Sequence, residues 1–299
     1  MINGHLCRWT FARPFPISGR ARERRQEDGW FMGLTQRWME RDERLAQVDE
    51  WVRKEERARF GSEELNEADK ADRVRRHFNA VARKYDFMNT LLSFGAHYWW
   101  KHRAVRMLGL NPGDRVLDVS GGTGDLSVLS QRAVGPAGRI VLYDINRAMI
   151  TAGREKGTHK AARRRIVYIQ GDAEKIAFRD HTFDAVMIGF AVRNITHMKQ
   201  AFGEMVRVLK PGGRFLCLEF SRPIQPWFRV LYDIYSFHIM PVLGNVIAGN
   251  RTAYSCLPET IRWFLLPDEL SDIFREVGLR KVRYRTLTNG IAVAHRAVK

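Results

Sequence analysis

A short glycine-rich segment next to acidic residues could bind a small ligand. Residues 116–125 read Val-Leu-Asp-Val-Ser-Gly-Gly-Thr-Gly-Asp, an apolar run followed by a turn with three glycines. Gly121, Gly122 and Gly124 have no side chain that would keep a ligand away from the backbone. Glycine also occurs wherever a chain only needs to bend, so this segment alone is a weak indication of binding.

Further short apolar runs also end in glycine or acidic residues. Asp144 lies 23 positions after Gly121, close to the offset of about 20 residues at which a strand-end carboxylate meets ribose hydroxyls. Ligands of open α/β sheets bind at the carboxyl ends of the strands. The candidate cofactor-binding residues at these ends are Asp118, Gly121, Gly122, Thr123, Gly124, Asp144, Asp172, Ala173 and Gly189.

The acidic residue after the last glycine helps to distinguish between the candidate ligands. Dinucleotide folds prefer Gly-x-Gly-x-x-Gly, so that a helix N-terminus can hold a pyrophosphate, whereas Asp125 would repel a phosphate there. S-adenosylmethionine carries a sulfonium and an amino group but no phosphate, and carboxylates suit its amino group, ribose and adenine edge. We therefore favour S-adenosylmethionine over NAD. Asp125 could also simply cap the helix that follows.

The strands and helices that must position these residues alternate along the chain. Short apolar runs at 116–119, 139–144, 166–170, 183–188 and 214–220 are separated by amphipathic helical patterns. This alternation predicts an α/β fold with a parallel sheet covered by helices on both faces.

Several segments, taken in order, resemble a known enzyme family. The glycine loop, Asp144, Gly171-Asp-Ala173 and Leu209-Lys-Pro-Gly-Gly213 resemble a class I S-adenosylmethionine-dependent methyltransferase. Longer stretches from 73 to 299 resemble the ubiquinone/menaquinone biosynthesis C-methyltransferase family (UbiE type). They are Tyr85-Asp-Phe-Met-Asn89 with Leu92-Ser93, His97 and Trp100; Arg193-Asn194; 207–221; Tyr235-Ser-Phe-His238; and 287–292.

The resemblance implies both a fold and an activity. The fold is Rossmann-like, with a mostly parallel seven-stranded sheet flanked by helices and an N-terminal helical extension. The activity is S-adenosylmethionine-dependent C-methylation of a polyprenylated quinol, either a benzoquinol of the ubiquinone route or a naphthoquinol of the menaquinone route. No metal is expected. Family members often have serine where this chain has Gly189.

The resemblance also implies catalytic groups. Arg193 and Asn194 would lie beside the transferred methyl, with Tyr85 and His238 as further candidates. An arginine is too basic to act as a free base, so we favour a role in holding an oxyanion or a water. The alternatives are that Arg193 forms a salt bridge with Asp86 or Glu219, that His238 is a packed histidine, and that Tyr85 only closes the cofactor site.

Other function classes remain open at this point. A methyltransferase for another phenolic or RNA acceptor would keep the cofactor residues but would not need the block from Tyr85 to Trp100. A non-catalytic scaffold of a quinone-synthesis complex would not need an intact cofactor set. A nicotinamide oxidoreductase is the weakest alternative.

Charge is unevenly distributed and bears on the partners. The net charge is +17, yet residues 26–72 hold fourteen acidic and eight basic residues. The excess of positive charge beyond residue 72 favours an anionic membrane surface, and no nucleic-acid module is found. We expect a protein that is cytoplasmic and peripherally bound to the inner membrane, on the matrix side in a mitochondrion. A homodimer or a quinone-biosynthesis complex is a further expected assembly.

The chain divides into a charged N-terminal extension and a longer domain. Residues 1–72 form a charged extension, predicted to be partly disordered or helical, whose first 25 residues resemble a transit peptide. Residues 73–299 form the methyltransferase domain, with a helical cover inserted at about 223–262. The apolar stretch 227–248 is interrupted by charged and polar residues, so no transmembrane helix is predicted. The three scattered cysteines, Cys7, Cys217 and Cys256, indicate a reducing compartment.

Overall fold

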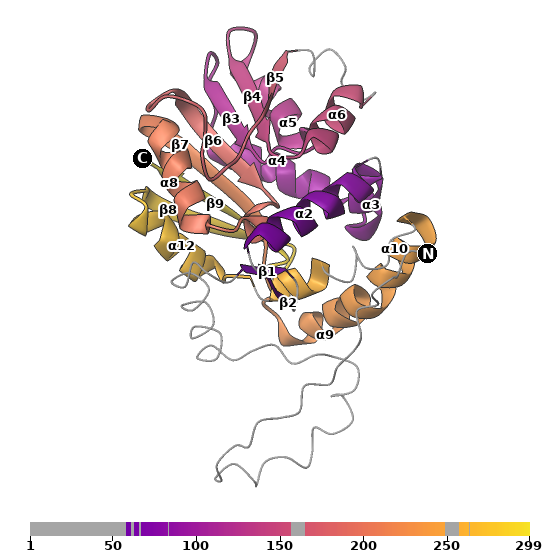
Figure 1. Cartoon of the computed structure of the whole chain (residues 1–299). Helices are drawn as coiled ribbons and strands as arrows, with labels where there is room; N and C mark the ends of the chain where they lie inside the picture. Colours follow the sequence, from indigo (N-terminus) through magenta and orange to yellow (C-terminus); the bar gives the residue numbers. More distant parts are fainter. Residues whose placement is uncertain are drawn as a thin grey trace. The chain divides into compact units, whose positions relative to one another are not determined.

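The core of the described chain is a sheet of seven strands (Figure 1). The computed structural model describes residues 58–60, 63–65, 67–82, 84–156, 165–248, 257–262 and 264–299. The strands are β3 (Arg115–Val119), β4 (Arg139–Asp144), β5 (Ile166–Gln170), β6 (Phe183–Gly189), β7 (Leu209–Phe220), β8 (Arg280–Leu287) and β9 (Ala292–Val298).

The order of the strands reverses at β3. It runs β5-β4-β3-β6-β7-β9-β8, with β5 through β7 parallel and β9 antiparallel to both of its neighbours. The chain moves outward from β3 to β5 and then returns to β6 on the other side of β3. Ligands bind where the order reverses in this way. The predicted mostly parallel seven-stranded sheet is confirmed.

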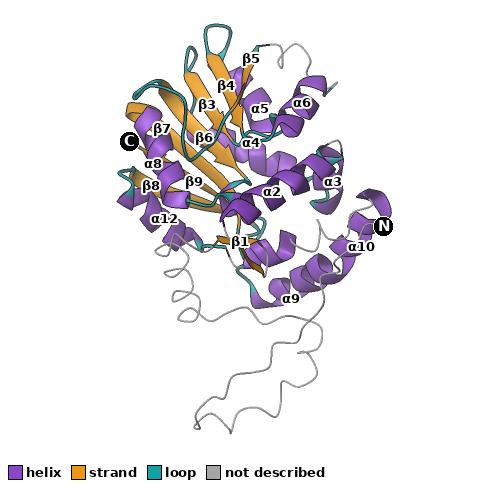
Figure 2. Cartoon of the chain, viewed as in Figure 1, coloured by secondary structure: helices purple, strands orange, loops and turns teal. Residues whose placement is uncertain are grey.

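Helices cover both faces of the sheet (Figure 2). The chain also contains a 3₁₀ turn, η1 (Val192–Asn194), and a π-helical turn, η2 (Tyr235–Ile239). The α-helices are α2 (Glu67–Val81), α3 (Tyr85–Leu92), α4 (Ala96–Leu108), α5 (Asp125–Val134), α6 (Arg147–Glu155), α8 (Met198–Val208), α9 (Pro226–Ile234), α10 (Met240–Ala248) and α12 (Pro267–Glu276).

Side chains alternate along each strand between the two faces of the sheet, so the apolar core has two parts. Val116 packs with side chains of α4 and α5, whereas the next residue, Leu117, packs with side chains of α8 and α12. Both are completely buried, because neighbouring residues of a strand point to opposite faces. Cys217 is a free, buried cysteine in the same apolar cluster as Leu117, in keeping with a packing role.

A helical cover follows β7 and lies beside α3. It consists of α9, η2 and α10, and Met240 packs with Val81, Met88 and Leu92 in a third apolar cluster. Residues 257–262 form a further helical segment. The carboxylate of Asp233 in the cover is buried and forms an ion pair of 2.8 Å with a guanidinium nitrogen of Arg262.

The cover also bears on the predicted absence of a transmembrane helix. The π turn joins α9 to α10, so the continuous helix Pro226–Ile247 has 22 residues and is long and apolar enough to cross a membrane by length and composition. A helical cover was predicted here, with an apolar run too interrupted to cross a membrane; in the structure the residues that interrupt the apolar run do not interrupt the helix. One such helix is weak evidence of a span, since core helices of soluble proteins meet the same criterion.

The structure differs from the sequence-based expectation around residue 72. Residues 58–65 include two short antiparallel strands, β1 (Ala58–Phe60) and β2 (Glu63–Leu65), where a helical extension was expected. The predicted domain boundary at 72/73 falls inside α2. Lys70 of α2 is buried and donates a hydrogen bond of 2.9 Å to the backbone oxygen of Ile195. This contact joins α2 to the segment after β6, and charge composition could not reveal it. The expectations for residues 1–57 lie outside the described residues.

Candidate functional site

The glycine loop connects β3 to α5 at the edge of the sheet where the strand order reverses. Gly122 and Gly124 have φ angles of +55° and +83°, in the left-handed region that glycine adopts without strain. At Gly121 an added Cβ would lie 2.7 Å from Cγ of Leu142. The loop therefore needs glycine both for its backbone path and for close packing against β4.

The predicted carboxylate of Asp144 lies beside this loop. Its side chain is buried at the end of β4 and accepts hydrogen bonds from the backbone N–H groups of Gly122 (2.8 Å) and Asn146 (2.7 Å). Burial raises its pKa above the ordinary value despite these two bonds. Asp144 therefore fixes the loop, and the neighbouring Ile145 is an apolar side chain with 57% exposure, against which a planar ring could stack.

The remaining predicted cofactor residues follow the adjacent strands. Asp172 is exposed after β5 and accepts a hydrogen bond of 2.9 Å from the backbone N–H of Glu174, and Ala173 beside it is buried. Gly189 ends β6. A Cβ there would come within 2.6 Å of Cδ1 of Leu126, so a serine at this position would require Leu126 to move.

Asp118 occupies a different environment from the other carboxylates. It is completely buried, accepts a hydrogen bond of 2.6 Å from the Ser127 hydroxyl, and has no partner for its Oδ1 among the described residues. Burial raises the pKa of Asp118 to about 7, and the charges of Asp144 and Asp125 contribute in the same direction. Asp118 also packs against the glycine loop, because a Cβ added at Gly121 would lie 3.0 Å from its carboxylate carbon.

Two lysines that the sequence analysis did not single out hold Asp125 in place. Nζ of Lys101 lies 2.8 Å from its Oδ2, and Nζ of Lys156 lies 2.6 Å from its Oδ1. Burial alone would raise the pKa of Asp125, but the two ammonium groups outweigh it and keep that pKa well below the ordinary value. Lys156 also pairs with Asp86 at 2.7 Å, and Asp86 accepts a hydrogen bond from buried Thr123. The glycine loop is thereby tied to α3.

A largely apolar cavity of about 380 Å³ adjoins this ion-pair group. Aromatic and aliphatic side chains supply most of its wall, and Tyr85, Arg193 and Asn194 of the predicted catalytic set are among its lining residues. The other lining residues are Phe78, Val81, Asn89, Leu92, Ser93, Phe94, Ala96, His97, Trp100, Lys101, Phe190, Phe220, Phe228, Leu231, Tyr232, Tyr235, Met240, Leu257, Thr260, Ile261, Thr288 and Ile291.

Arg193 is held by an ion pair that the sequence analysis raised as an alternative. Its Nη1 donates to Oε1 of buried Glu219 (2.7 Å) and to the backbone oxygen of Phe190 (2.8 Å). The guanidinium carbon lies 5.1 Å from the ring centroid of Phe220. The structure shows no hydrogen bond from Nε or Nη2 to the described residues, so these groups can donate to a ligand. Asn194 follows directly and lines the same cavity.

His97 is a second polar side chain in the cavity wall. It is 3% exposed, and its Nε2 lies 3.1 Å from the hydroxyl oxygen of Thr90. Its Nδ1 is buried and has no hydrogen-bond partner among the described residues. Burial, followed by the charge of Lys101, lowers the pKa of His97 to about 4. In the sequence, His97 stands out only as part of a segment that resembles the UbiE-type family.

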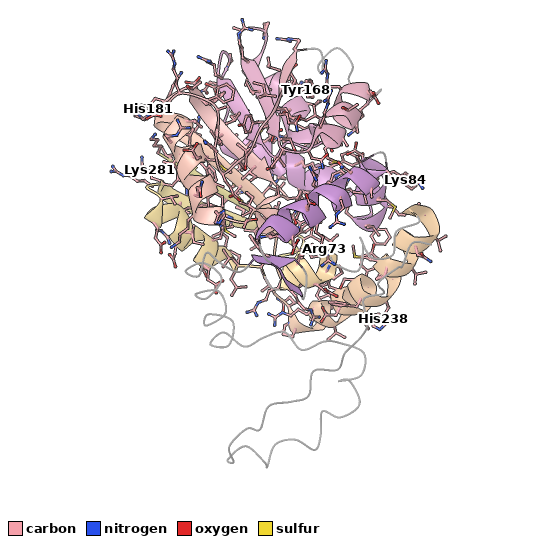
Figure 3. The ribbon with its side chains drawn as sticks, viewed as in Figure 1. Arg73, Lys84, Tyr168, His181, His238 and Lys281 are labelled. Carbon is pink, nitrogen blue, oxygen red and sulfur yellow. The ribbon has the colours of Figure 1, made fainter. Side chains whose placement is uncertain are left out.

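The structure does not place His238 in the cavity. Its side chain is exposed and lies at the outer edge of the cover (Figure 3), and it is absent from the cavity wall. The physical reason is the π turn, in which one extra residue is accommodated per turn. The inward positions along the cover are therefore Tyr235 and then Met240, five residues later, and His238 faces outward.

Known proteins match most of the chain. Residues 66–299 match the ubiE/COQ5 methyltransferase family. A ubiquinone/menaquinone biosynthesis C-methyltransferase UbiE of Ectopseudomonas mendocina is 43% identical over 240 residues, which cover 80% of this chain and 94% of that protein. The UbiE protein of Stutzerimonas stutzeri is 42% identical over the same coverage.

Solved structures agree on the fold. A SAM-dependent methyltransferase of Thermotoga maritima has a TM-score of 0.53 and 18% identity, and the match covers 75% of this chain and 99% of that chain. The alternative of a nicotinamide oxidoreductase is not supported by any of these comparisons.

Replacing Asp118 by Asn should change how stability depends on pH. With a folded-state pKa of about 7 and an ordinary value of 3.8, the folded wild type binds a proton between pH 4 and 7 that the unfolded chain has released. Wild type should therefore lose up to about 4 kcal/mol relative to Asp118→Asn as the pH rises through this window. Urea unfolding of the ligand-free proteins at pH 4, 5, 6, 7 and 8 measures the difference, and parallel profiles would contradict it.

Proposed function

Since the chain belongs to the ubiE/COQ5 methyltransferase family, we propose that it transfers a methyl group from S-adenosylmethionine to a ring carbon of a polyprenylated quinol. The UbiE relatives carry ubiquinone and menaquinone biosynthesis in their names, so the ring is a benzoquinol or a naphthoquinol. The single observation that carries the proposal is a largely apolar cavity with few polar side chains, whose lining residue Lys101 is ion-paired with Asp125 at the end of the glycine loop.

The residues of the glycine loop and the neighbouring strand ends fit S-adenosylmethionine. Gly121, Gly122 and Gly124 bring the backbone close to the ligand, and Asp144 ends the strand beside them, as a ribose-binding carboxylate would. Asp172 and Ala173 lie at the next strand end and would meet the adenine. Bound there, S-adenosylmethionine supplies an electrophilic methyl on a sulfonium centre.

The chain's own residues would then orient and activate the acceptor. A ring carbon becomes nucleophilic when a neighbouring hydroxyl loses its proton, and after methylation that carbon must lose its own proton to restore the aromatic ring. The site must therefore stabilise the oxyanion that forms before the transfer. Nε and Nη2 of Arg193 are donors in the cavity wall, and the ion pair with Glu219 holds the guanidinium in place. Asn194 offers a further amide, and Tyr85 at the start of α3 closes the cavity near the ion-pair group. The apolar wall keeps water away from the reacting atoms.

The polyprenyl tail suggests how the protein meets its substrate. We propose peripheral binding to a membrane through the helical cover and the corner between α3 and α4. Phe94 and Leu231 both line the cavity and are 83% and 55% exposed, and Val242 and Val246 on the cover are 55% and 76% exposed. An exposed apolar surface that continues from a cavity mouth gives a lipid tail a path into a bilayer.

Other acceptors fit this cavity less well. An RNA base would be stacked and accompanied by cations that contact the phosphates, yet among the described lining residues the only lysine, Lys101, is paired with Asp125, and the only arginine, Arg193, is paired with Glu219. A scaffold would not need the glycine geometry of the loop. A small phenol would leave most of the apolar wall without contacts.

Arg193→Lys should keep the charge beside Glu219 but remove the planar set of donors. We expect kcat to fall by about 10²-fold, the usual effect of losing an oxyanion donor, with little change in S-adenosylmethionine affinity. Transfer of label from methyl-labelled S-adenosylmethionine to chemically reduced demethylmenaquinol, and separately to the demethylated ubiquinol precursor, provides the measurement.

The matched control for this substitution is Arg214→Lys. Arg214 forms an equally short, poorly exposed ion pair with Asp114, at the opposite end of the sheet from the glycine loop, and its replacement should leave kcat unchanged. Failure of wild type to methylate either quinol, despite measurable S-adenosylmethionine binding, would overturn the proposed function.

Gly121→Ala should weaken S-adenosylmethionine binding by at least tenfold. The added Cβ would meet Leu142 and the carboxylate carbon of Asp118 at 2.7 and 3.0 Å, so the loop must shift. Gly203→Ala is the control, because a Cβ there meets nothing within 4 Å. Titration calorimetry gives both affinities, and equal affinities of the two variants would argue against the loop as the cofactor site.

Val246→Asp should reduce membrane binding several-fold without affecting methyl transfer to a short-chain quinol in solution. A charge on this exposed position of the cover opposes insertion into the interface. Co-sedimentation with vesicles of phosphatidylglycerol and phosphatidylcholine measures the bound fraction. Val167→Asp on the edge strand β5, where Val167 is 47% exposed, serves as the control. Equal losses in both variants would contradict docking through the cover.

A further inference from the structure

The most informative polar group that the mechanism leaves unused is His97. We propose that Nδ1 of His97 accepts a hydrogen bond from a ring hydroxyl of the acceptor, so that the site selects the reduced quinol over the oxidised quinone. The inference rests on the proposed quinol acceptor and adds a residue that determines which redox state is bound.

His97 forms part of the wall of the cavity in which the acceptor would bind. It belongs to the first turn of α4 and is one of the lining residues of the cavity, together with Tyr85 and Arg193. Only 3% of the residue is exposed, and Nδ1 has no partner among the described residues. A buried polar atom left without a hydrogen bond costs free energy, so a ligand that supplies a donor at this point is favoured.

The hydrogen-bond network determines which ring nitrogen carries the proton. The hydroxyl oxygen of Thr90 lies 2.8 Å from the backbone oxygen of Asp86, which can only accept, so the single hydroxyl proton of Thr90 points there. Because that proton is used, Nε2 of His97, 3.1 Å away, is the donor to the Thr90 oxygen. With the proton on Nε2, Nδ1 presents a lone pair.

The charged groups around His97 leave the imidazole neutral. Lys101 lies on the same helix, Asp86 on α3, Asp125 on α5 and Lys156 after α6. The two lysines and the two aspartates are engaged with one another. Burial and the charge of Lys101 dominate, and the pKa of His97 is lowered to about 4. At neutral pH Nδ1 is therefore an acceptor only.

An acceptor at this position distinguishes the two redox states of the ring. A quinol hydroxyl donates to Nδ1, whereas a quinone carbonyl would bring its own lone pairs against that of Nδ1. Moving the proton of His97 to Nδ1 would require Thr90 to abandon its bond to Asp86. The quinone has no hydroxyl proton to lose and cannot become nucleophilic, so its exclusion keeps the site free for the form that reacts. The reaction that supplies the substrate must therefore deliver the ring as the quinol, or a two-electron reduction of the quinone must come before methylation.

Two substitutions separate this role from a merely structural one. The amide of asparagine can place an oxygen near the position of Nδ1, whereas the amide of glutamine reaches the position of Nε2 and can maintain the contact with Thr90. His97→Asn should therefore keep the preference for quinol, and His97→Gln should lose it. Thr90→Val, which is close in size to the native residue, removes the group that fixes the tautomer and should weaken the preference while the imidazole is retained.

The measurement is anaerobic equilibrium binding to the full-length protein in the presence of S-adenosylhomocysteine. The probes are a demethylnaphthoquinol with one prenyl group and the corresponding quinone. Wild type and His97→Asn should bind the quinol at least about tenfold more tightly than the quinone, a ratio typical of one buried unpaired group. In His97→Gln the ratio should approach one. Thermal unfolding checks that every variant is folded.

The outcomes separate the two proposals. If His97→Gln keeps the wild-type ratio, or if asparagine loses the preference while glutamine retains it, the role of Nδ1 is overturned, because a structural contact through Nε2 would explain the data. If wild type binds neither probe and methylates neither quinol, the proposed function itself fails. If wild type methylates the quinol but binds both redox states equally, only the inference about His97 fails.

Discussion

The reversal of strand order between β3 and β6 is the constraint on which the rest of the site depends. Parallel strands end at the same edge of a sheet, so the glycine loop after β3 and the segment from Gly189 to Asn194 after β6 become neighbours. One side of that edge offers backbone and carboxylates, and the other offers Arg193. A methyl donor and an acceptor held on the two sides would meet between them, which is the geometry that a direct transfer requires.

Ion pairs of low solvent exposure fix the positions of the side chains at this edge of the sheet. Lys101 and Lys156 neutralise Asp125 and Asp86, and Glu219 neutralises Arg193. Such pairs gain little net stability once their desolvation is counted, but removing one partner leaves a buried charge and is costly. Their effect is to fix positions: the first group ties α3 to the glycine loop, and the second aims the free donors of Arg193 at the cavity. The cofactor side and the acceptor side are therefore coupled through α3 and α4.

The helical cover has two kinds of surface on one continuous helix. Its inward side chains complete the cavity wall, and its outward side chains leave an apolar strip exposed. The buried ion pair between Asp233 and Arg262 anchors the cover against the segment that follows it. This combination explains why the stretch satisfies a length and hydropathy criterion for a membrane span although part of it packs on α3. An apolar tail that passed through the cavity mouth would meet apolar side chains both inside the cavity and on the exposed strip outside it.

The sequence by itself determined the fold class, the glycine loop and the strand-end residues such as Asp144, because these depend on local periodicity and on spacing along the chain. It also pointed to Arg193, and to Glu219 as a candidate partner. Only the tertiary structure decided that Lys101 and Lys156 converge on Asp125, because these contacts join segments distant in sequence. It also decided that Nδ1 of His97 has no partner among the described residues, which depends on how the neighbouring helices pack. It also turned His238 outward, since a π turn changes the helical phase by one residue and leaves no signal in a 3.6-residue pattern.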